Sequence, residues 1–343
     1  QFSGLLQMEG GTLNIAGRLE NTAGGTPDIL IPGIGISISG GIINLNTIGS
    51  DDKETATFHA SATSDLNISG GTFVLHKPNT AAIPFNDVYI IPGAGKKNIS
   101  GGAFQFGDTN TLGRSLFLIK SGIPVNNLII NPESKPGVSL TGVLAINNQL
   151  SLNGHLLLNG HHLLLGRDAP AISGKFGAKD GMIVMNNGAS GGEVRKLFST
   201  NGTYHFPIGD NTGVTDYSPL TLDLISGQYG DSAFVGVKVV NAKSPLISTQ
   251  KDFIKRFWSL QTNGIRGPTY KTSATYTDAD VVGDRDKMAV GTFDGSSWKN
   301  DRTLKEGPNV LVTSGSADDG VSIVLSAAAV MDCTPPAKPT PGN

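Results

Sequence analysis

The stretch that decides the fold is Asn67–Gly71, which reads Asn-Ile-Ser-Gly-Gly. The same five residues return at Asn98–Gly102, and the last four of them stand at Ile38–Gly41. Doubled glycines therefore begin at positions 10, 40, 70 and 101, and they are spaced by 30, 30 and 31 residues. A fixed period of this length indicates a protein built from stacked repeats.

The residues between the doubled glycines are typical of β-strands. Apolar and polar side chains alternate over Thr12–Ala16, Ile36–Ile38 and Ile43–Leu45, and a period of two places the apolar side chains on one face. Short strands with glycine at the corners, repeated about every 30 residues, predict a parallel β-helix in which each repeat is one coil.

The repeat continues in a weaker form beyond Gly102. Partial matches at Leu140–Gly142 and Ile172–Gly174 indicate about six coils in all. The gap of 40 residues from Gly102 to Gly142 predicts an insertion near Phe104–Pro124. One buried ladder, with its members one coil apart, is expected to contain Leu13, Ile38, Ile68 and Ile99.

Length and composition agree with this fold class. A chain of 343 residues is long enough for two domains. Charged residues make up 16% of it, below the usual ~25%, and glycine is frequent at 46 residues, so we expect an all-β protein. The formal net charge is −2 and no basic patch stands out, so nucleic acid is not a predicted partner. The sequence has no apolar run of about 18 residues, and we therefore expect no transmembrane segment in this stretch.

The 30-residue rhythm stops near Asn186–Gly188. Short runs of strand-forming residues separated by turns follow, which predicts an antiparallel, immunoglobulin-like β-sandwich. The predicted strands are Glu193–Phe198, Gly202–Phe206, Leu220–Ile225, Ala233–Val240, Arg256–Leu260, Tyr270–Tyr276, Lys287–Phe293, Asn309–Thr313 and Ser322–Ser326.

Three local features of the sandwich are predicted as well. We expect Trp258 to lie buried between two sheets, in contact with Val237 and Leu222. Asp294-Gly295 and Asp319-Gly320 are each expected to form the turn of a hairpin, because Asp-Gly suits the left-handed backbone of such turns.

These patterns divide the chain into residues 1–187 as a parallel β-helix, 188–330 as a β-sandwich and 331–343 as a proline-rich linker. The single cysteine, Cys333, opens the linker, which we expect to lead into a further domain. The chain begins at Gln1 without methionine, and its first coil has no cap in view. We therefore expect preceding residues or a neighbouring chain to cover that coil.

Five segments of the second half follow one another in a familiar order: Glu193–Lys196, Tyr204–Asp210, Tyr217–Leu222, Lys255–Leu260 and Asp294–Trp298. With the leucine-rich stretch Leu150–Gly166 before them, they resemble modules of very large secreted surface proteins of Bacteroidota, over about residues 138–330. The resemblance implies export by the type IX secretion route and display as an adhesin or a gliding-associated filament. It transfers no catalytic residue to this chain.

Four aspartates are the candidate metal ligands. Asp278, Asp280, Asp284 and Asp286 form the pattern Asp-x-Asp-x-x-x-Asp-x-Asp around Gly283, and oxygen-rich loops of this kind can hold Ca²⁺. Their spacing does not match an EF-hand, so the alternative is a polar turn between strands. We expect no other cofactor.

Three histidines cluster in the leucine-rich repeat, at His155, His161 and His162. Histidine is a common metal ligand, but no carboxylate or cysteine joins these residues at ligand spacing. The pattern favours polar positions between inward-facing leucines over a metal site.

The predicted function is that of an extracellular structural or adhesive protein rather than an enzyme, a rigid stalk or filament segment on the bacterial cell surface. Its expected partners are other domains of the same polypeptide, surface polysaccharide and neighbouring surface proteins. The alternative is a β-helix protein that binds or cleaves polysaccharide. Cleavage needs carboxylates gathered on one face, whereas Asp28, Asp65 and Asp87 are scattered. The chain also contains no Gly-x-Ser-x-Gly motif for a serine nucleophile.

Overall fold

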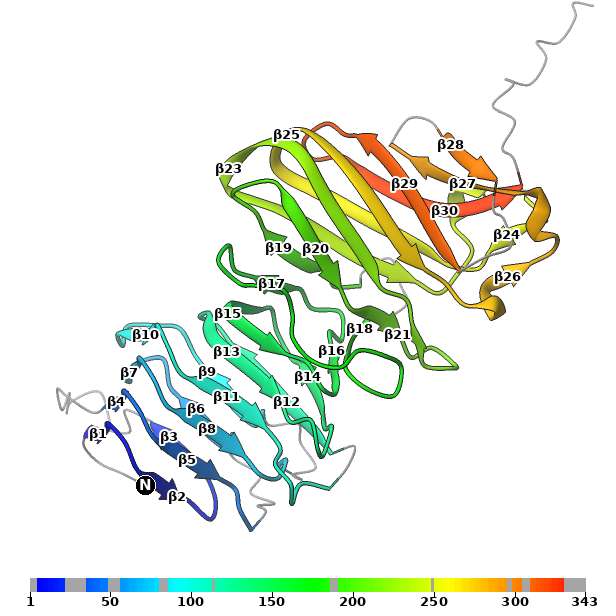
Figure 1. The fold of residues 1–343 in the computed structure, drawn as a ribbon. Coiled ribbons are helices and arrows are strands. Elements are labelled where there is room, and N and C mark those ends of the chain that lie inside the picture. The colour runs from blue at the N-terminus through cyan, green and yellow to red at the C-terminus, as the bar shows by residue number, and fades with distance from the viewer. Residues whose placement is uncertain are drawn as a thin grey trace, which may run out of the picture. The chain divides into compact units, whose positions relative to one another are not determined.

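The computed structural model describes residues 5–21, 35–48, 56–79, 86–112, 115–185, 191–247, 250–294, 298–303 and 309–329. Strands dominate this part of the chain, with three short 3-10 helices between them (Figure 1). The predicted all-β class is therefore confirmed. The described residues contain no helix that is long and apolar enough to cross a membrane.

The chain divides into two compact units. The first unit is Gln1–Phe198 with His205–Tyr217, and the second is Ser199–Tyr204 with Ser218–Asn343. The predicted boundary at residues 187–188 and the predicted linker with Cys333 both lie outside the described residues.

The first unit contains three sheets of parallel strands, named here A, B and C. Sheet A consists of β1 (Leu5–Met8), β4 (Gly35–Ile38), β7 (Asp65–Ile68) and β10 (Lys97–Ile99). The strands of sheet B in this unit are β2 (Thr12–Asn14), β5 (Ile42–Leu45), β8 (Thr72–Leu75), β11 (Ala103–Phe106), β13 (Val125–Ile130), β15 (Leu144–Ser151), β17 (Leu163–Leu165) and β19 (Val194–Leu197).

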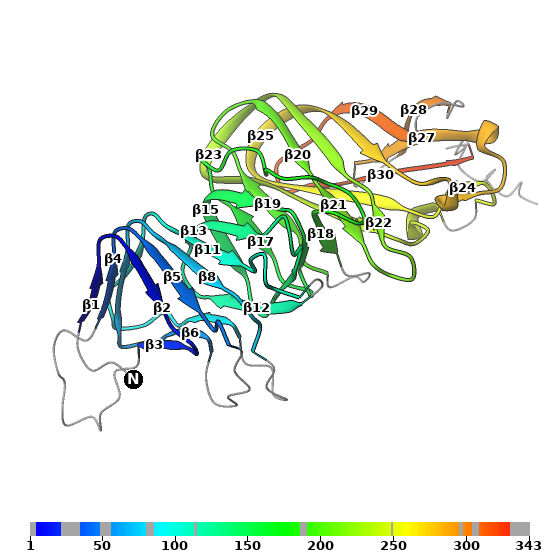
Figure 2. The ribbon, with the colours of Figure 1, turned by 60° about the horizontal axis from the view of Figure 1, so that its bottom comes forward.

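Sheet C consists of β3 (Leu19–Asn21), β6 (Phe58–Ala60), β9 (Val88–Ile90), β12 (Leu116–Ser121), β14 (Gly137–Leu140), β16 (His155–Leu157), β18 (Met182–Met185), β21 (Ile208–Asp210) and β22 (Asp216–Tyr217). Its last pair, β21 with β22, is antiparallel. Up to β12, each repeat supplies one strand to sheets A, B and C in turn. Figure 2 shows β1, β2 and β3 on three sides of the first repeat.

Buried ladders run through the repeats, because residues one period apart are partners on neighbouring strands. Ile38 pairs with Ile68, and Ile68 with Ile99, and all three are buried, as predicted. The fourth predicted member, Leu13, was wrong: it pairs with Ile43 in sheet B, and Met8 takes its place beside Ile38. Leu13 follows its doubled glycine, whereas the isoleucines precede theirs, so the corner separates them into different sheets.

The doubled glycines have two separate physical causes, which Gly70 and Gly71 illustrate. A Cβ added at Gly70 would lie 2.1 Å from the carbonyl oxygen of Ser39 in the preceding repeat, so the corners stack with backbone against backbone. Gly71 has a φ of +79°, in the left-handed region that glycine adopts without strain. One glycine allows the close approach, and the other allows the turn.

The predicted insertion near Phe104–Pro124 was wrong, because this stretch supplies two regular strands, β11 and β12. Ala103 pairs with Asn127, and Asn127 with Gln149, so the repeats shorten to 24 and 22 residues. They shorten because β10 is the last strand of sheet A among the described residues. Eight described strands stack in sheet B of this unit, which is more than the six repeats predicted.

The strands of the second unit pair in antiparallel fashion. They are β23 (Leu220–Val240), β24 (Phe253–Ile254), β25 (Phe257–Thr275), β26 (Val281–Val282), β27 (Met288–Phe293), β28 (Trp298–Thr303), β29 (Val310–Ser316) and β30 (Ser322–Ala329). The 3-10 helices η1 (Pro245–Ile247), η2 (Asp278–Asp280) and η3 (Arg285–Lys287) lie between them, and β20 (Gly202–Phe206) contributes residues to both units.

Two pairs of predicted strands are single long strands in the structure. Leu220–Ile225 and Ala233–Val240 both belong to β23, and Arg256–Leu260 and Tyr270–Tyr276 both fall in β25 except for Arg256 and Tyr276. β23 pairs along its length with β25. Turns were predicted between these strands, but the β23–β25 pair keeps its direction through register shifts, one of them between Tyr229 and Phe234. Glycine thus marks a bulge here rather than a reversal.

The hairpin predicted at Asp319-Gly320 was also wrong. β29 pairs with Thr269–Thr275 of β25, and β30 pairs with Trp258–Gln261 of the same strand. Both run in the same direction along β25, so the chain continues past Asp319 without reversing. At the other predicted turn, Phe293 pairs with Trp298 across the antiparallel strands β27 and β28, while residues 295–297 lie outside the described part.

Trp258 is fully buried, as predicted, and its indole Nε1 donates a 3.0 Å hydrogen bond to the carbonyl oxygen of Ser218. Its backbone partners on the flanking strands are Val239 and Leu325. The predicted contacts of Trp258 with Val237 and Leu222 stay predictions.

Candidate functional site

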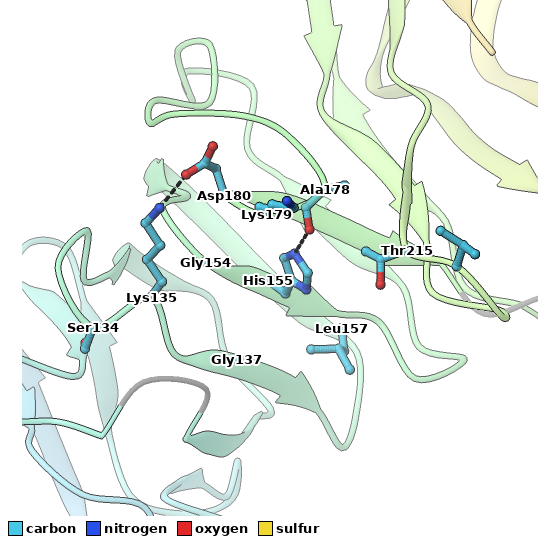
Figure 3. A pocket seen from close by; sticks show the side chains of 11 residues that line it. Ser134, Lys135, Gly137, Gly154, His155, Leu157, Ala178, Lys179, Asp180 and Thr215 are labelled. Carbon is cyan, nitrogen blue, oxygen red and sulfur yellow. Dashed lines mark hydrogen bonds and ion pairs between the residues drawn. The ribbon is translucent and has the colours of Figure 1, made fainter. Parts of the chain in front are cut away.

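The first unit contains a cavity of about 850 Å³ on the outer side of sheet C (Figure 3). Strands β14 and β16 supply its floor, and three turns that are distant in sequence supply its walls. The lining residues are Ser134, Lys135, Gly137, Gly154, His155, Leu157, Ala178, Lys179, Asp180, Val214 and Thr215. A volume of this size falls in the range of about 300–1,000 Å³ that small-molecule sites occupy.

The floor follows from strand alternation. Val138 and Leu156 point into the buried interior, so their neighbours Gly137, His155 and Leu157 point to the outer side. A Cβ at Gly137 would lie 3.2 Å from the side chain of Leu116 and 3.6 Å from that of Leu157. The two leucine side chains therefore pack closely over Gly137, and the floor is apolar at this point.

An ion-pair network holds one wall. The Asp180 carboxylate pairs with the ammonium of Lys135 and, at 3.2 Å, with that of Lys175. The hydrogen bond from Lys135, followed by that from Lys175, lowers the pKa of Asp180 below its usual value, so this carboxylate stays ionised. The network ties the turn before β14 to the loop before β18.

The tautomer of His155 is set by its neighbour. Its Nε2 lies 3.1 Å from the carbonyl oxygen of Ala178 (Figure 3), and a carbonyl can only accept, so Nε2 carries the proton. Burial lowers the pKa of this imidazole, which keeps it neutral near pH 7. In this state Nδ1 is a hydrogen-bond acceptor at the cavity.

The three histidines noted in the sequence do not form one site. His155 lines the cavity, whereas His162 uses Nδ1 to accept a 3.1 Å hydrogen bond from the backbone N–H of Glu193. His161 donates its backbone N–H to Leu158. The described residues hold no group of three or more histidine, cysteine, aspartate or glutamate side chains placed to bind a metal ion.

The four candidate calcium ligands have different surroundings. Asp280 is buried and accepts a 3.0 Å hydrogen bond from Arg256 Nε, while Asp278 is exposed and accepts bonds from Arg285 and Asn309.

The other two aspartates lie around η3. Asp284 accepts the backbone N–H of Asp286 and pairs with Lys287 at 3.1 Å, and these interactions, the one with Lys287 first, lower its pKa. The calcium site stays a prediction, with no carboxylate cluster assembled around it among the described residues.

A polar network at the edge of sheet B was not predicted. His76 Nδ1 lies 2.8 Å from Asp108 Oδ2, and its Nε2 lies 3.0 Å from Asn44 Oδ1. Thr111 donates to Asp108 at 2.9 Å. Burial raises the pKa of Asp108, but the bond from Thr111 and the charge of His76 outweigh it, and the net shift is downward. Its members are one repeat apart, so the network joins neighbouring repeats.

Asp87 is a second buried carboxyl that links repeats. It accepts the backbone N–H groups of Asn79 at 2.6 Å and Leu118 at 2.7 Å. Burial raises its pKa to about 7, against the opposing effect of these bonds. It is a structural group inside the stack and has no access to the cavity residues of β14 and β16.

Sequence reasoning singled out His155 but missed the other polar residues of the cavity. Lys135, Lys179, Asp180 and Thr215 come from separate turns, and no spacing in the sequence connects them. Gly137 carried no signal, because the chain contains many glycines with other roles.

No family model, curated protein or solved structure matches this chain.

Proposed function

We propose that this protein is a rigid, extracellular segment of a bacterial surface protein, a stalk or filament that displays adhesive modules away from the cell. In this proposal the first unit is a parallel β-helix, and the second is an immunoglobulin-like β-sandwich. The protein acts mechanically and by binding, without catalysis.

The observation that carries the proposal is the continuity of the hydrogen-bonded ladders. In sheet B, Leu13, Ile43, Phe73 and Phe104 are successive partners, so each repeat bonds to the next without a break. The rings of Phe73 and Phe104 stack at 5.1 Å inside this ladder. Such one-dimensional stacks are stabilised by neighbour-to-neighbour contacts, which suits a stiff spacer.

The resemblance of residues 138–330 to Bacteroidota surface proteins supports the same proposal. It implies a location outside the cell, export by the type IX route and a role in an adhesin or a gliding-associated filament. The partners would be other domains of the same polypeptide, surface polysaccharide or neighbouring surface proteins.

Surface labelling tests the proposal. An antibody against the folded first unit should label intact, unpermeabilised cells of the bacterium that encodes the chain, and inactivating type IX secretion should abolish the label. Deleting the chain should reduce attachment or gliding. Label that appears only after permeabilisation would overturn the proposal, whereas label that survives loss of type IX secretion would overturn the export route alone.

The alternative, a protein that binds or cleaves polysaccharide, is favoured by one observation, the cavity on sheet C. It combines an apolar floor with convergent polar groups, as ligand sites do. Its lining contains one carboxylate, Asp180, and that group is held in ion pairs with Lys135 and Lys175. Glycosidic cleavage by two carboxyl groups is therefore not supported by this lining, and binding is the better-supported form of the alternative.

A further inference from the structure

The cavity on sheet C has three chemical features that together define a ligand. The first is an apolar part of the floor, formed by Leu157 and Gly137. The side chain of Leu116, which is 48% exposed, packs against Gly137 from the neighbouring strand β12. A ligand that lies on this part of the floor needs an apolar face of its own, because Leu157 and Gly137 have no side-chain hydrogen-bonding group.

The second feature is a set of neutral hydrogen-bonding groups above the floor. His155 presents Nδ1 as an acceptor, because Nε2 donates to Ala178. Thr215 adds a hydroxyl group, which can donate or accept, and Ser134, whose hydroxyl donates to Asn131 Oδ1 at 3.4 Å, adds an acceptor. Figure 3 shows His155 and Thr215 on different elements of the chain. An acceptor beside hydroxyls suits a ligand that carries several hydroxyl groups.

The third feature is an excess of positive charge. Lys135 and Lys179 line the cavity, and the single acidic lining residue, Asp180, is already paired with Lys135 and Lys175. Lys179 is exposed, and among the described residues no hydrogen bond or ion pair engages its ammonium group. The site can therefore neutralise an anionic group at its rim without breaking the ion pairs of its wall.

We propose that this cavity binds a carboxylated sugar, a uronic acid residue of an acidic polysaccharide. The apolar face of the pyranose ring lies on Leu157 beside Gly137, ring hydroxyls bond to His155 and Thr215, and the carboxylate faces Lys179. A simple inorganic anion would use the lysine but leave the floor and the hydroxyl groups unused. A neutral sugar would use the floor but leave the charge of Lys179 without a counter-charge.

The biological relevance of this binding rests on the proposed extracellular function, because acidic polysaccharides occur outside the cell. The binding itself is a property of the purified chain and can be measured separately. A chain that is displayed on the surface but binds no uronate would refute this inference alone. A chain that binds uronate but is not displayed would refute the proposed function alone.

The experiment is calorimetric titration of the whole chain with short oligomers of galacturonate, glucuronate and mannuronate, beside the matching neutral oligosaccharides and inorganic phosphate. At least one uronate oligomer should bind in the millimolar range or better, and at least about tenfold more tightly than its neutral counterpart, since one charge-assisted hydrogen bond is involved. No binding of any uronate at millimolar concentration would overturn the inference. If the neutral oligosaccharides bind as tightly as the uronates, the proposed role of Lys179 in binding the carboxylate is wrong. If phosphate binds as tightly as uronate, the cavity is a general anion site and the proposed sugar specificity is wrong.

Matched variants locate the binding. Lys179→Ala should weaken uronate binding about tenfold or more and leave neutral-sugar binding unchanged, whereas Lys271→Ala, which removes an exposed lysine from β25 in the second unit, should change neither. Thr215→Val should weaken both ligands. Circular dichroism and unfolding temperature verify that each variant is folded. Uronate affinity that is the same in Lys179→Ala and in the unmodified chain would place the ligand elsewhere.

Discussion

Replacing Asp280 by alanine should destabilise the second unit by about 3–5 kcal/mol. The Asp280 side chain is 5% exposed and the Arg256 side chain is 0% exposed, and Arg256 Nε donates to Asp280 Oδ2 at 3.0 Å. The same oxygen accepts from the backbone N–H of Thr277 at 2.8 Å and from its hydroxyl at 2.9 Å. Removing the carboxylate takes an ion-pair partner away from a buried guanidinium and frees two donors of Thr277 at the start of η2.

The magnitude follows from comparing this pair with an exposed one in the same segment. Breaking a buried ion pair by removing one partner costs about 3–5 kcal/mol, whereas exposed pairs contribute about 0–1 kcal/mol. Asp278 provides the matched control, because its side chain is 85% exposed and it also accepts from an arginine, Arg285, at 2.9 Å. Asp278→Ala should therefore destabilise the second unit far less than Asp280→Ala.

The assay is urea unfolding followed by tryptophan fluorescence. The chain has 2 tryptophans, Trp258 and Trp298, and both belong to the second unit, so the signal reports on that unit. The midpoint for Asp280→Ala should fall well below that of Asp278→Ala, with or without Ca²⁺. Equal midpoints for the two variants would refute the reasoning from burial. A Ca²⁺-dependent rise in stability that both variants abolish would favour the predicted calcium site instead.

Three further predictions test the stack and the second core. Gly70→Ala should lower the stability of the first unit by several kcal/mol in thermal unfolding, because the new Cβ would lie 2.1 Å from the carbonyl oxygen of Ser39. Gly10→Ala is the control and should be nearly neutral, because a Cβ at Gly10 has no atom within 4 Å. Equal losses of stability in the two variants would contradict the stacking argument. The folded state holds the Asp87 proton more tightly than the unfolded state, so the stability of the first unit should fall by up to about 4 kcal/mol as the pH rises from about 4 to about 7. Asp87→Asn should flatten this part of the curve of stability against pH. If Asp87→Asn leaves the curve unchanged, another group causes the pH dependence. Trp258→Ala should cost about 3–5 kcal/mol in denaturant unfolding followed by circular dichroism, and a loss below about 1 kcal/mol would show that the indole contributes little to the core.

Much of the local structure could be predicted from the sequence because it depends on neighbours along the chain. The doubled glycines marked the corners, and alternation marked the strands, since both follow from backbone geometry that each short stretch carries itself. The partners Ile38, Ile68 and Ile99 followed from the period alone. Leu13 was assigned to the wrong ladder because distance from a glycine was counted without regard to the side of the corner.

The errors in the second unit share a different cause. Turns between short strands and a hairpin at Asp319-Gly320 were predicted, but the same backbone conformations also occur at bulges and interruptions in a long strand pair. Gly320 has a φ of +79°, which a turn and an interruption both permit. Whether the chain reverses at Gly320 depends on which strand pairs with β29 and which with β30. Both pair with β25, which is distant in sequence, so the chain does not reverse.

The cavity shows most clearly what only the tertiary structure decided. The sequence by itself determined that repeats stack, that their interior is apolar and that His155 stands at an outward position of a strand. Lys135, Lys179 and Thr215 line one cavity because three turns that are separate in the sequence lie around the same two strands. A repeat period fixes what lies one layer away within a sheet, because hydrogen-bonded strands are neighbours at a constant spacing. It carries no information about loops that leave the sheet, because their positions are set by packing against parts of the chain that the period does not count.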